Sequence, residues 1–446
     1  MQENKLNSTP MLKLIISMSL PAMFSMLVQA LYNIVDSIFV AQYSKEALDA
    51  VSYAFPIQML MVAVSVGTGV GVNSLVARKL GEKNQHDADS AATHGIVLSA
   101  ISWVIFLVFG LFFAEPFFKA FTDNQQIVIM GKQYLSILCI FSLGSFIQIA
   151  IEKILQGTGD MIMPMAGQLI GAITNIILDP IMIFGYFGFP KMGIAGAAIA
   201  TVIGQIVAMI FLVLVIIFKK HLVTINFKDF KFSSKTVKNI YTVGFPSIIM
   251  QSIASVLIMG LNAILGAISD VGVTILGVYY KLQSFVFMPV FGLTQGLMPI
   301  MGYNYGARNK KRLIDAMIKG MIIAVIIMTL GTFLFWLQTD TLLEIFKANE
   351  DMLKEGIPAL RIISLCFVPA ALGITFSTVF QSTGMGLYSL IVSLLRQLVL
   401  ILPIAYFMSA FGLVYVWSAF PIAEIGSFVV SIYLYYRLYR KNIKYL

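Results

Sequence analysis

Long apolar runs separated by short polar segments are the dominant pattern along this chain. A helix needs about 20 mostly apolar residues to cross the hydrocarbon core of a bilayer, and twelve runs reach that length. The predicted spans cover residues 15–41, 51–76, 93–115, 134–155, 165–187, 194–218, 240–265, 272–300, 315–337, 357–379, 387–408 and 413–436. The pattern therefore predicts an all-α membrane protein with twelve transmembrane helices.

The second half of the chain repeats the first in one constant register, in which Pro21 corresponds to Pro246. The motif pairs that keep this register are Leu20-Pro21 with Phe245-Pro246, Gly81-Glu82 with Gly306-Ala307, and Gln156-Gly157 with Gln381-Ser382. Because each copy holds six spans, both enter the membrane in the same direction, and we expect two pseudo-symmetric six-helix lobes. We predict an N-lobe over residues 1–218, a cytoplasmic linker over 219–239 and a C-lobe over 240–446. Two such lobes favour transport by alternating access.

Charged residues make up only 11% of the 446 positions, against about 25% in a soluble domain. This shortage excludes a soluble enzyme and a nucleic-acid-binding protein, although the formal net charge is +9. The segments that face inward when both termini are cytoplasmic hold 20 of the 30 Lys and Arg residues. The positive-inside rule therefore predicts cytoplasmic termini in a multi-pass protein of the cytoplasmic (inner) membrane, surrounded by the lipid bilayer.

Two acidic residues, Asp36 and Asp179, lie inside predicted spans of the first half, within about 10 Å of the outer edge of the hydrocarbon. A charge at mid-bilayer costs about 2.5–3.5 kcal/mol, so its presence points to a function. Asn175 lies one turn before Asp179, and Thr201 reaches a similar depth in the sixth span. We predict that these four residues form a cation-coupling site for H⁺ or Na⁺. The alternative is a pair of protonated or hydrogen-bonded structural aspartates.

Other polar positions extend this predicted site. Gln29, Tyr32 and Asn33 share one face of the first span with its aspartate and are candidates for lining a cavity. Pro180 cannot donate a backbone hydrogen bond to the Ile176 carbonyl, which leaves that oxygen available as an acceptor. Neither aspartate has an acidic counterpart at the corresponding position of the second half. We therefore expect the site in the first half alone.

The second half carries charges of its own, Lys281, Arg396 and Glu424, in spans eight, eleven and twelve. Arg396 and Glu424 lie near mid-membrane and can pair. The pair can be a salt bridge that holds the bundle, or it can act in substrate binding or conformational coupling, and the sequence leaves both interpretations open. In the first half, we expect Glu152 and Lys153 to be structural and to reach the interface by snorkelling.

The sequence gives no sign of enzyme chemistry. Cys139 and Cys366 lie in apolar runs, the three histidines are far apart, and no metal-site spacing or nucleotide-binding loop occurs. The motif Gly157-Thr158-Gly159-Asp160 fits the GxGD pattern of intramembrane aspartyl proteases. Its aspartate, however, falls at the opposite face of the membrane from the other two. We predict a protein without enzymatic activity or cofactor that draws its energy from an ion gradient.

The chain resembles the multidrug and toxic compound extrusion (MATE) family over nearly its full length. The motifs that carry the resemblance are Ser19 to Pro21, Asn33 to Ser37, Gly81-Glu82, Gln156 to Gly159, and Asn175 to Pro180 followed by Gly193 and Gly196. One acidic residue in span one and another in span five resemble the DinF-like branch. Other branches place their acidic site in the second lobe, where this chain has two basic residues instead.

The resemblance implies a secondary antiporter that exports organic cations and drugs in exchange for H⁺ or Na⁺. It also implies that Asp36, Asn175, Asp179 and Thr201 form the cation site and that Pro21 allows span one to bend. We expect a monomer that transports cationic or amphipathic small molecules. A lipid-linked precursor flippase or polysaccharide exporter of the same superfamily is the alternative, and a receptor or scaffold is a more distant one.

Overall fold

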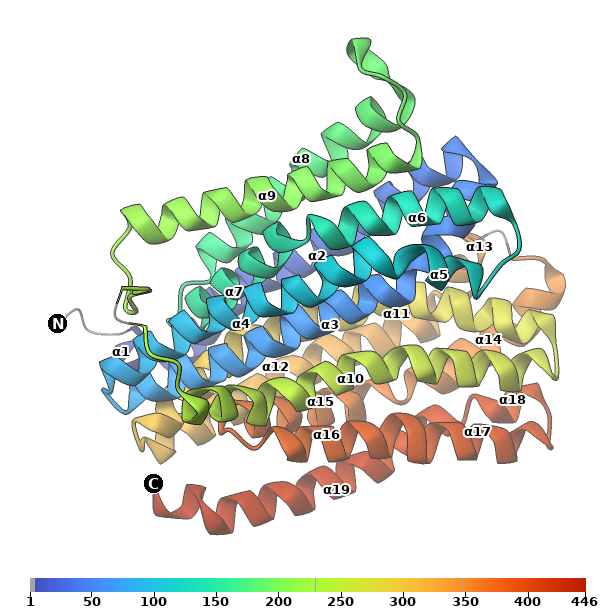
Figure 1. Ribbon diagram of the computed structural model, residues 1–446. Helices are drawn as coiled ribbons and strands as arrows, with labels where there is room; N and C mark the ends of the chain where they lie inside the picture. Colours follow the sequence, from blue (N-terminus) through green and yellow to red (C-terminus); the bar gives the residue numbers. More distant parts are fainter. Residues whose placement is uncertain (1–4, 229, 347) are drawn as a thin grey trace. The chain divides into compact units, whose positions relative to one another are not determined.

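The computed structural model describes residues 5–228, 230–346 and 348–446, which form helices joined by loops (Figure 1). The connection between residues 218 and 234 is longer than most of the others. The helices of the first half are α1 (Lys5–Ser8), α2 (Met11–Tyr43), α3 (Lys45–Gly81), α4 (Gln85–Phe112), α5 (Ala114–Lys119), α6 (Gln125–Ile140), α7 (Leu143–Gly157), α8 (Ile162–Phe184), the 3₁₀ helix η1 (Tyr186–Gly188) and α9 (Ile194–Phe218).

The helices of the second half are α10 (Ser234–Gly266), α11 (Asp270–Gly306), α12 (Lys310–Leu337), α13 (Thr339–Glu344), α14 (Glu350–Ser364), α15 (Phe367–Ser382), α16 (Gly386–Leu394), the π helix η2 (Leu395–Ile401), α17 (Leu402–Ser409), α18 (Leu413–Val416), α19 (Ala419–Lys441) and the 3₁₀ helix η3 (Ile443–Tyr445).

Ten spans in the described ranges are helical, long enough and apolar enough to cross a membrane. Two further pairs, α6 with α7 and α14 with α15, pass the same test together but are bent by 45° and 42° at a short break. At the first break the Ser142 hydroxyl donates to the Cys139 carbonyl at 2.8 Å, a local bond that competes with the helical ladder. Counted as one span each, the pairs bring the total to twelve, and the predicted all-α, twelve-span architecture is confirmed.

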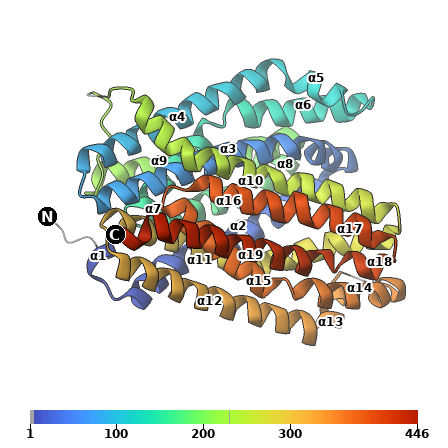
Figure 2. The same ribbon diagram turned by 90° about the horizontal axis from the view of Figure 1, so that it is seen from below.

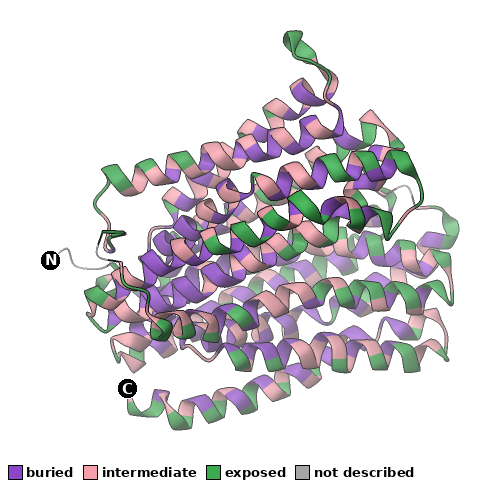
Figure 3. Cartoon of the chain, in the orientation of Figure 1, coloured by how far each residue is buried: buried purple, intermediate pink, exposed green. Residues whose placement is uncertain are grey.

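Exposed positions occur along most of the helices (Figure 3), and many of them are large apolar residues, as contact with lipid requires. On α12 the exposed residues Ile322, Ile326, Leu330, Phe333 and Leu337 follow one another at intervals of three or four. This spacing places them on one face of the helix. A soluble monomer rarely exposes so large an apolar patch, so the stripe fits a surface in contact with the bilayer.

The internal repeat extends to the local geometry of the chain. Helices α3 and α11 each contain 37 residues, and their first residues correspond to each other in the register of the repeat. After each comes a residue with positive φ, Lys83 at 58° and Arg308 at 54°. Asn84 and Asn309 then cap the next helices, each accepting a hydrogen bond from the backbone N–H three residues later. Equivalent turns and caps therefore end equivalent spans, as expected for two pseudo-symmetric halves.

The chain is divided into two compact units, which do not coincide with the two halves of the sequence. Unit 1 consists of Met1–Met23, Ala77–Lys83 and Phe245–Leu446, and unit 2 consists of Phe24–Val76 and Asn84–Gly244. Helices α2, α3 and α10 contribute residues to both units. Within unit 1, the Ser19 hydroxyl donates to the Leu293 carbonyl at 3.3 Å, so the start of α2 packs on α11. Within unit 2, Gly71 allows α3 to approach Ile240 near the start of α10.

The connecting segments are held in place by specific hydrogen bonds. In unit 1, the Arg312 guanidinium donates to the Leu6 and Thr9 carbonyls, which fixes α1 beside the start of α12 (Figures 1 and 2). In unit 2, the segment after α9 is tied to α4. Its Thr224 N–H donates to Asp89, and later its Ser233 N–H donates to the His94 ring at 2.9 Å.

Glycines bring α8 and α9 of unit 2 into close contact. A Cβ added at Gly196 would lie 2.5 Å from the Met182 carbonyl oxygen, and one at Gly204 would lie 2.7 Å from that of Gly171. Real Cβ atoms do not approach backbone oxygens this closely, so a side chain at either position would force the two helices apart locally. Small residues allow membrane helices to pack backbone against backbone. This contact sets the spacing of the polar side chains described next.

Candidate functional site

Three of the four predicted cation-site residues are joined by hydrogen bonds between α8 and α9. Asn175 and Asp179 lie one turn apart on the buried face of α8, and Thr201 faces them from α9. The Asn175 side-chain Nδ2 donates to the Asp179 carboxylate at 3.3 Å and to the Thr201 hydroxyl at 3.2 Å. All three residues are buried.

Asp36 of α2 completes the group. Its carboxyl group lies within hydrogen-bonding reach of the Asp179 carboxyl group. Asp36 Oδ1, Asn175 Oδ1 and Asp179 Oδ2 are buried, and none of the three atoms has a hydrogen-bond partner within the described part of the chain. Buried polar atoms are normally paired, so three unsatisfied acceptors around two facing carboxyl groups favour a hydrogen-bond donor or a cation as their partner. A proton or a small cation coordinated by oxygen would satisfy them.

Tyr134, which the sequence analysis did not single out, lies near the carboxyl groups, and Gln58 is hydrogen-bonded to it. The Tyr134 hydroxyl of α6 accepts a hydrogen bond from the Gln58 side chain of α3 at 3.0 Å, and Tyr134 interacts electrostatically with Asp36. Tyr32 lies near the Thr201 hydroxyl and interacts electrostatically with Asp36. The only available signal for Tyr134 and Gln58 was that each is a polar residue in an otherwise apolar stretch.

No hydrogen bond to the cation-site residues is seen for the remaining first-half candidates among the described residues. Gln29 is exposed, and the Asn33 side chain lies outside the described residues. Pro21 and Pro180 lie inside α2 and α8, and both helices continue through them. Each proline is therefore accommodated as a local loss of one backbone hydrogen bond.

The structure brings together two of the three second-half charges. Arg396 Nη1 lies 3.2 Å from a Glu424 carboxylate oxygen, which is the predicted pair. Lys281 is exposed, and its ammonium lies 5.8 Å from the centre of the Phe346 ring. The cation–π contact gives Lys281 a partner of its own.

The expectation that Glu152 and Lys153 snorkel to the interface is wrong, because both side chains are buried. The Glu152 carboxylate accepts hydrogen bonds from Gln148 at 2.9 Å and Gln168 at 2.8 Å, and the Lys153 ammonium donates to Gln156 at 2.9 Å. Neighbouring amide side chains thus provide the hydrogen bonds that water would give these two charged groups at the interface.

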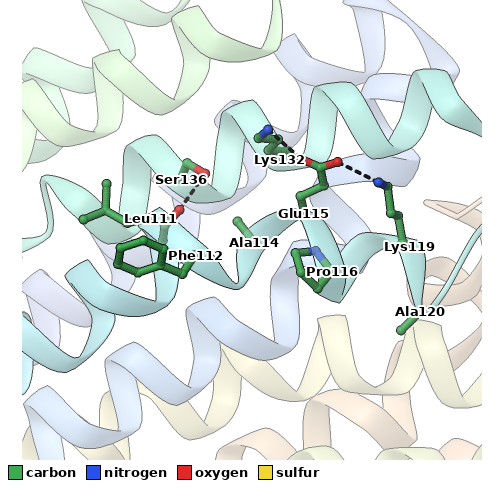
Figure 4. Close-up of a pocket in the computed structure, with 10 residues that line it drawn as sticks. Leu111, Phe112, Ala114, Glu115, Pro116, Lys119, Ala120, Lys132 and Ser136 are labelled. Carbon is green, nitrogen blue, oxygen red and sulfur yellow. Dashed lines mark hydrogen bonds and ion pairs between the residues drawn. The ribbon is translucent and has the colours of Figure 1, made fainter.

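A cavity of about 600 Å³ lies between α4, α5 and α6, away from these residues (Figure 4). Glu115 bridges Lys119 at 2.7 Å and Lys132 at 2.6 Å on its wall. Hydrogen bonds from Lys119, and next from Lys132, lower the pKa of Glu115 to about 2. Because these charges already satisfy one another, the cavity is not the best candidate for the functional site.

A sequence model of the MatE family matches residues 21–181 and again residues 246–407. The matched segments cover most of the chain, and their starts, Pro21 and Pro246, are corresponding positions of the internal repeat. The chain belongs to the MatE family. As a MatE protein it is a multi-pass membrane transporter, and the predicted resemblance is confirmed. The assignment to the DinF-like branch stays a prediction.

The MatE protein is similar to several transporters along most of its length. It is 25% identical to a FAD transporter of Shewanella oneidensis over 89% of this chain and 88% of that protein. It is 24% identical to the multidrug export protein MepA of Staphylococcus aureus over 93% and 91%, and 28% identical to the probable multidrug resistance protein NorM of Thermotoga maritima over 91% and 88%. An outward-facing MATE transporter structure matches with a TM-score of 0.93 and 28% identity, over 100% of this chain and 99% of that one.

Proposed function

We propose that this MatE transporter is an antiporter that exports cationic and amphipathic small molecules, including drugs, in exchange for H⁺ or Na⁺ bound at Asp36 and Asp179. The observation that carries the proposal is the set of three buried, unsatisfied oxygens on Asp36, Asn175 and Asp179. Similarity to the multidrug exporters MepA and NorM supports the substrate class. The FAD transporter shows that relatives at this level of identity also carry other solutes.

The chemistry of the site favours exchange over simple binding. Two ionised carboxylates about 4 Å apart repel by about 4 kcal/mol in an effective dielectric of roughly 20. A cation bound between Asp36 and Asp179 relieves this repulsion and draws the α2 and α8 carboxyl groups together. Because ion binding stabilises one arrangement of the helices, a change in occupancy can shift the balance between conformations. Release of the ion would restore the other arrangement.

Pro21 is proposed to let α2 respond to this change. The chain passes from unit 1 to unit 2 between Met23 and Phe24, two residues after the proline, and α2 lacks one backbone hydrogen bond there. Pro180 is proposed to loosen α8 in the same way beside Asp179. We place the protein in the cytoplasmic (inner) membrane as a monomer, with both termini in the cytoplasm and without enzymatic activity or cofactor.

The test is efflux of a cationic dye from cells and from proteoliposomes. We expect Asp36→Asn and Asp179→Asn each to reduce export to the background level. The matched control is Asp315→Asn, because Asp315 is partly exposed and pairs with Lys319 on one face of α12. Wild-type export by both site variants would refute the proposal. In proteoliposomes, an imposed pH gradient followed by an imposed Na⁺ gradient identifies the coupling ion.

A further inference from the structure

A second polar cluster lies in unit 1, outside the proposed cation site. Its centre is the pair formed by Arg396 of η2 and Glu424 of α19, two elements that pack together. Tyr280 interacts electrostatically with Arg396, and Cys366 interacts with both members of the pair. Tyr279 contacts the Cys366 thiol and lies within electrostatic reach of Glu424. Polar groups from α11 and from the turn between α14 and α15 therefore lie near this ion pair.

The exposed side of this pair is cationic. The Arg396 side chain is 22% exposed, whereas the Glu424 side chain is only 9% exposed. A solute that reaches the cluster therefore has more access to the Arg396 side chain than to the Glu424 side chain. Because the two charges balance each other, a preference for an anionic group depends on the hydrogen-bond donors of Arg396 that the pair leaves unused.

Hydrogen-bond donors in the cluster are not used up by protein groups. A guanidinium has five N–H donors. Within the described residues, the bond that Arg396 makes is the single one from Nη1 to Glu424. The Tyr280 hydroxyl is a further donor, buried without a partner there. The second carboxylate oxygen of Glu424 also lacks a partner, but it is an acceptor and does not add to the donors. An unsatisfied buried polar group costs about 1–3 kcal/mol, so spare donors on and beside the partly exposed Arg396 side chain favour an anionic oxygen ligand.

The backbone is specialised at the same point. The π-helical segment η2 carries Arg396 and ends just before Pro403, which has no N–H to donate to the carbonyl of Val399. Short π-helical segments inside α-helices occur frequently at functional sites. In the first half, the position that corresponds to Arg396 is Gly171, which closes the contact between α8 and α9. Because glycine at this position of the first half allows close helix packing, packing alone does not require an arginine at the corresponding position of the second half.

We propose that Arg396, with the Tyr280 hydroxyl, forms a second substrate-binding site that takes an anionic oxygen group, a carboxylate or phosphate, on the transported molecule. The inference rests on the proposed export function and extends its substrate class to zwitterionic and anionic amphipaths. Arg396 provides charge and paired N–H donors to the anionic group. Glu424 is a positioning residue that holds the guanidinium.

The experiment compares two dyes that differ in one group, a rhodamine with a free carboxylate and the methyl ester of the same rhodamine. We expect Arg396→Gln to raise the KM for the carboxylate dye about tenfold or more while export of the ester stays near wild type. Arg396→Lys should retain an intermediate preference, because lysine keeps the charge without the fork of donors. The matched control is Lys281→Gln, which removes an exposed charge of the same half and should change neither dye.

Arg396→Gln leaves the Glu424 carboxylate buried without its partner, which can prevent folding. A second variant therefore tests the same proposal without leaving a buried unpaired charge. The double variant Arg396→Gln/Glu424→Gln removes both charges and should show the same selective loss. Glu424→Gln alone keeps the guanidinium and should still export the carboxylate dye. Equal loss of both dyes, no loss of either, or loss of the carboxylate dye in Glu424→Gln as large as in Arg396→Gln would overturn the proposal.

The lipid composition of the proteoliposomes shows whether the anionic group at Arg396 belongs to the transported molecule or to a lipid headgroup. Proteoliposomes of phosphatidylcholine alone should show the full difference between the two dyes. If the difference appears only when phosphatidylglycerol is present, lipid headgroups occupy Arg396 and the substrate site is refuted. Failure of the proposed antiport gives a different result. In that case export of the ester dye does not depend on Asp36 or Asp179.

Discussion

Substitution of Gly204 by alanine tests whether the contact between α8 and α9 positions the cation site. The added Cβ would lie 2.7 Å from the Gly171 carbonyl oxygen and 3.2 Å from Asn175 Cβ, whereas ordinary contact begins at 3.4 Å. The helices must therefore separate locally by about 0.7 Å. The bond from Asn175 to Thr201, now 3.2 Å long, would stretch to about 3.9 Å, beyond hydrogen-bonding distance.

The energetic cost of Gly204→Ala combines two opposing effects. Overpacking a tight contact costs about 1–3 kcal/mol. Alanine in place of glycine inside a helix recovers up to about 1 kcal/mol. We therefore expect a net destabilisation of about 0–2 kcal/mol, small enough for the protein to fold. The loss of ion-driven export should be larger than this modest destabilisation suggests, because the altered hydrogen bond belongs to the site itself.

The assay measures dye efflux driven by an imposed ion gradient, together with thermal unfolding in detergent. Gly277→Ala is the matched control, because Gly277 is an exposed glycine of α11 and its added Cβ would meet no atom within 4 Å. We expect the control to export like wild type and to melt at or slightly above its temperature. Wild-type export and melting by Gly204→Ala would refute the role of this contact, as would equal defects in both variants.

Three further predictions concern other parts of unit 2. Glu115→Gln should lower the melting temperature near neutral pH, and the difference should fade as pH drops from the ordinary carboxyl pKa through about 2, because a lowered pKa stabilises the fold only while the carboxylate is ionised. A constant difference at all pH values would contradict this. Phe118→Ala should destabilise by about 3–5 kcal/mol because the ring is fully buried, whereas Phe187→Ala, 89% exposed, should melt like wild type. Tyr134→Phe should slow ion-driven efflux without loss of expression, and unchanged transport rates would exclude its hydroxyl from the site.

The core of the cation site was accessible from sequence because part of it is local. Asn175 and Asp179 are four residues apart, so any helix through them places both on one face. The partners from other helices required an estimate of membrane depth. That estimate brought in Asp36 and Thr201, but it could not single out Tyr134, because an isolated tyrosine in an apolar span is equally consistent with packing.

In the second half, the sequence predicted fewer of the contacts that the structure contains. Arg396 and Glu424 were predicted as a possible pair, whereas Lys281 was grouped with them and instead contacts Phe346. Nothing in the periodicity indicated the π-helical segment that carries Arg396. Glu152 and Lys153 were expected at the interface, but amide side chains of α7 and α8 accommodate them in the interior.

The sequence by itself determined the membrane class, the twelve spans, the duplication and the family, because these follow from run length, spacing and motifs along one chain. The tertiary structure decided which side chains meet, where helices bend, and how α2, α3 and α10 are divided between the two compact units. The physical reason is the range of the interactions. Helix formation is set by neighbours in sequence, whereas the approach of two helices depends on glycines and carbonyls that lie far apart in the chain.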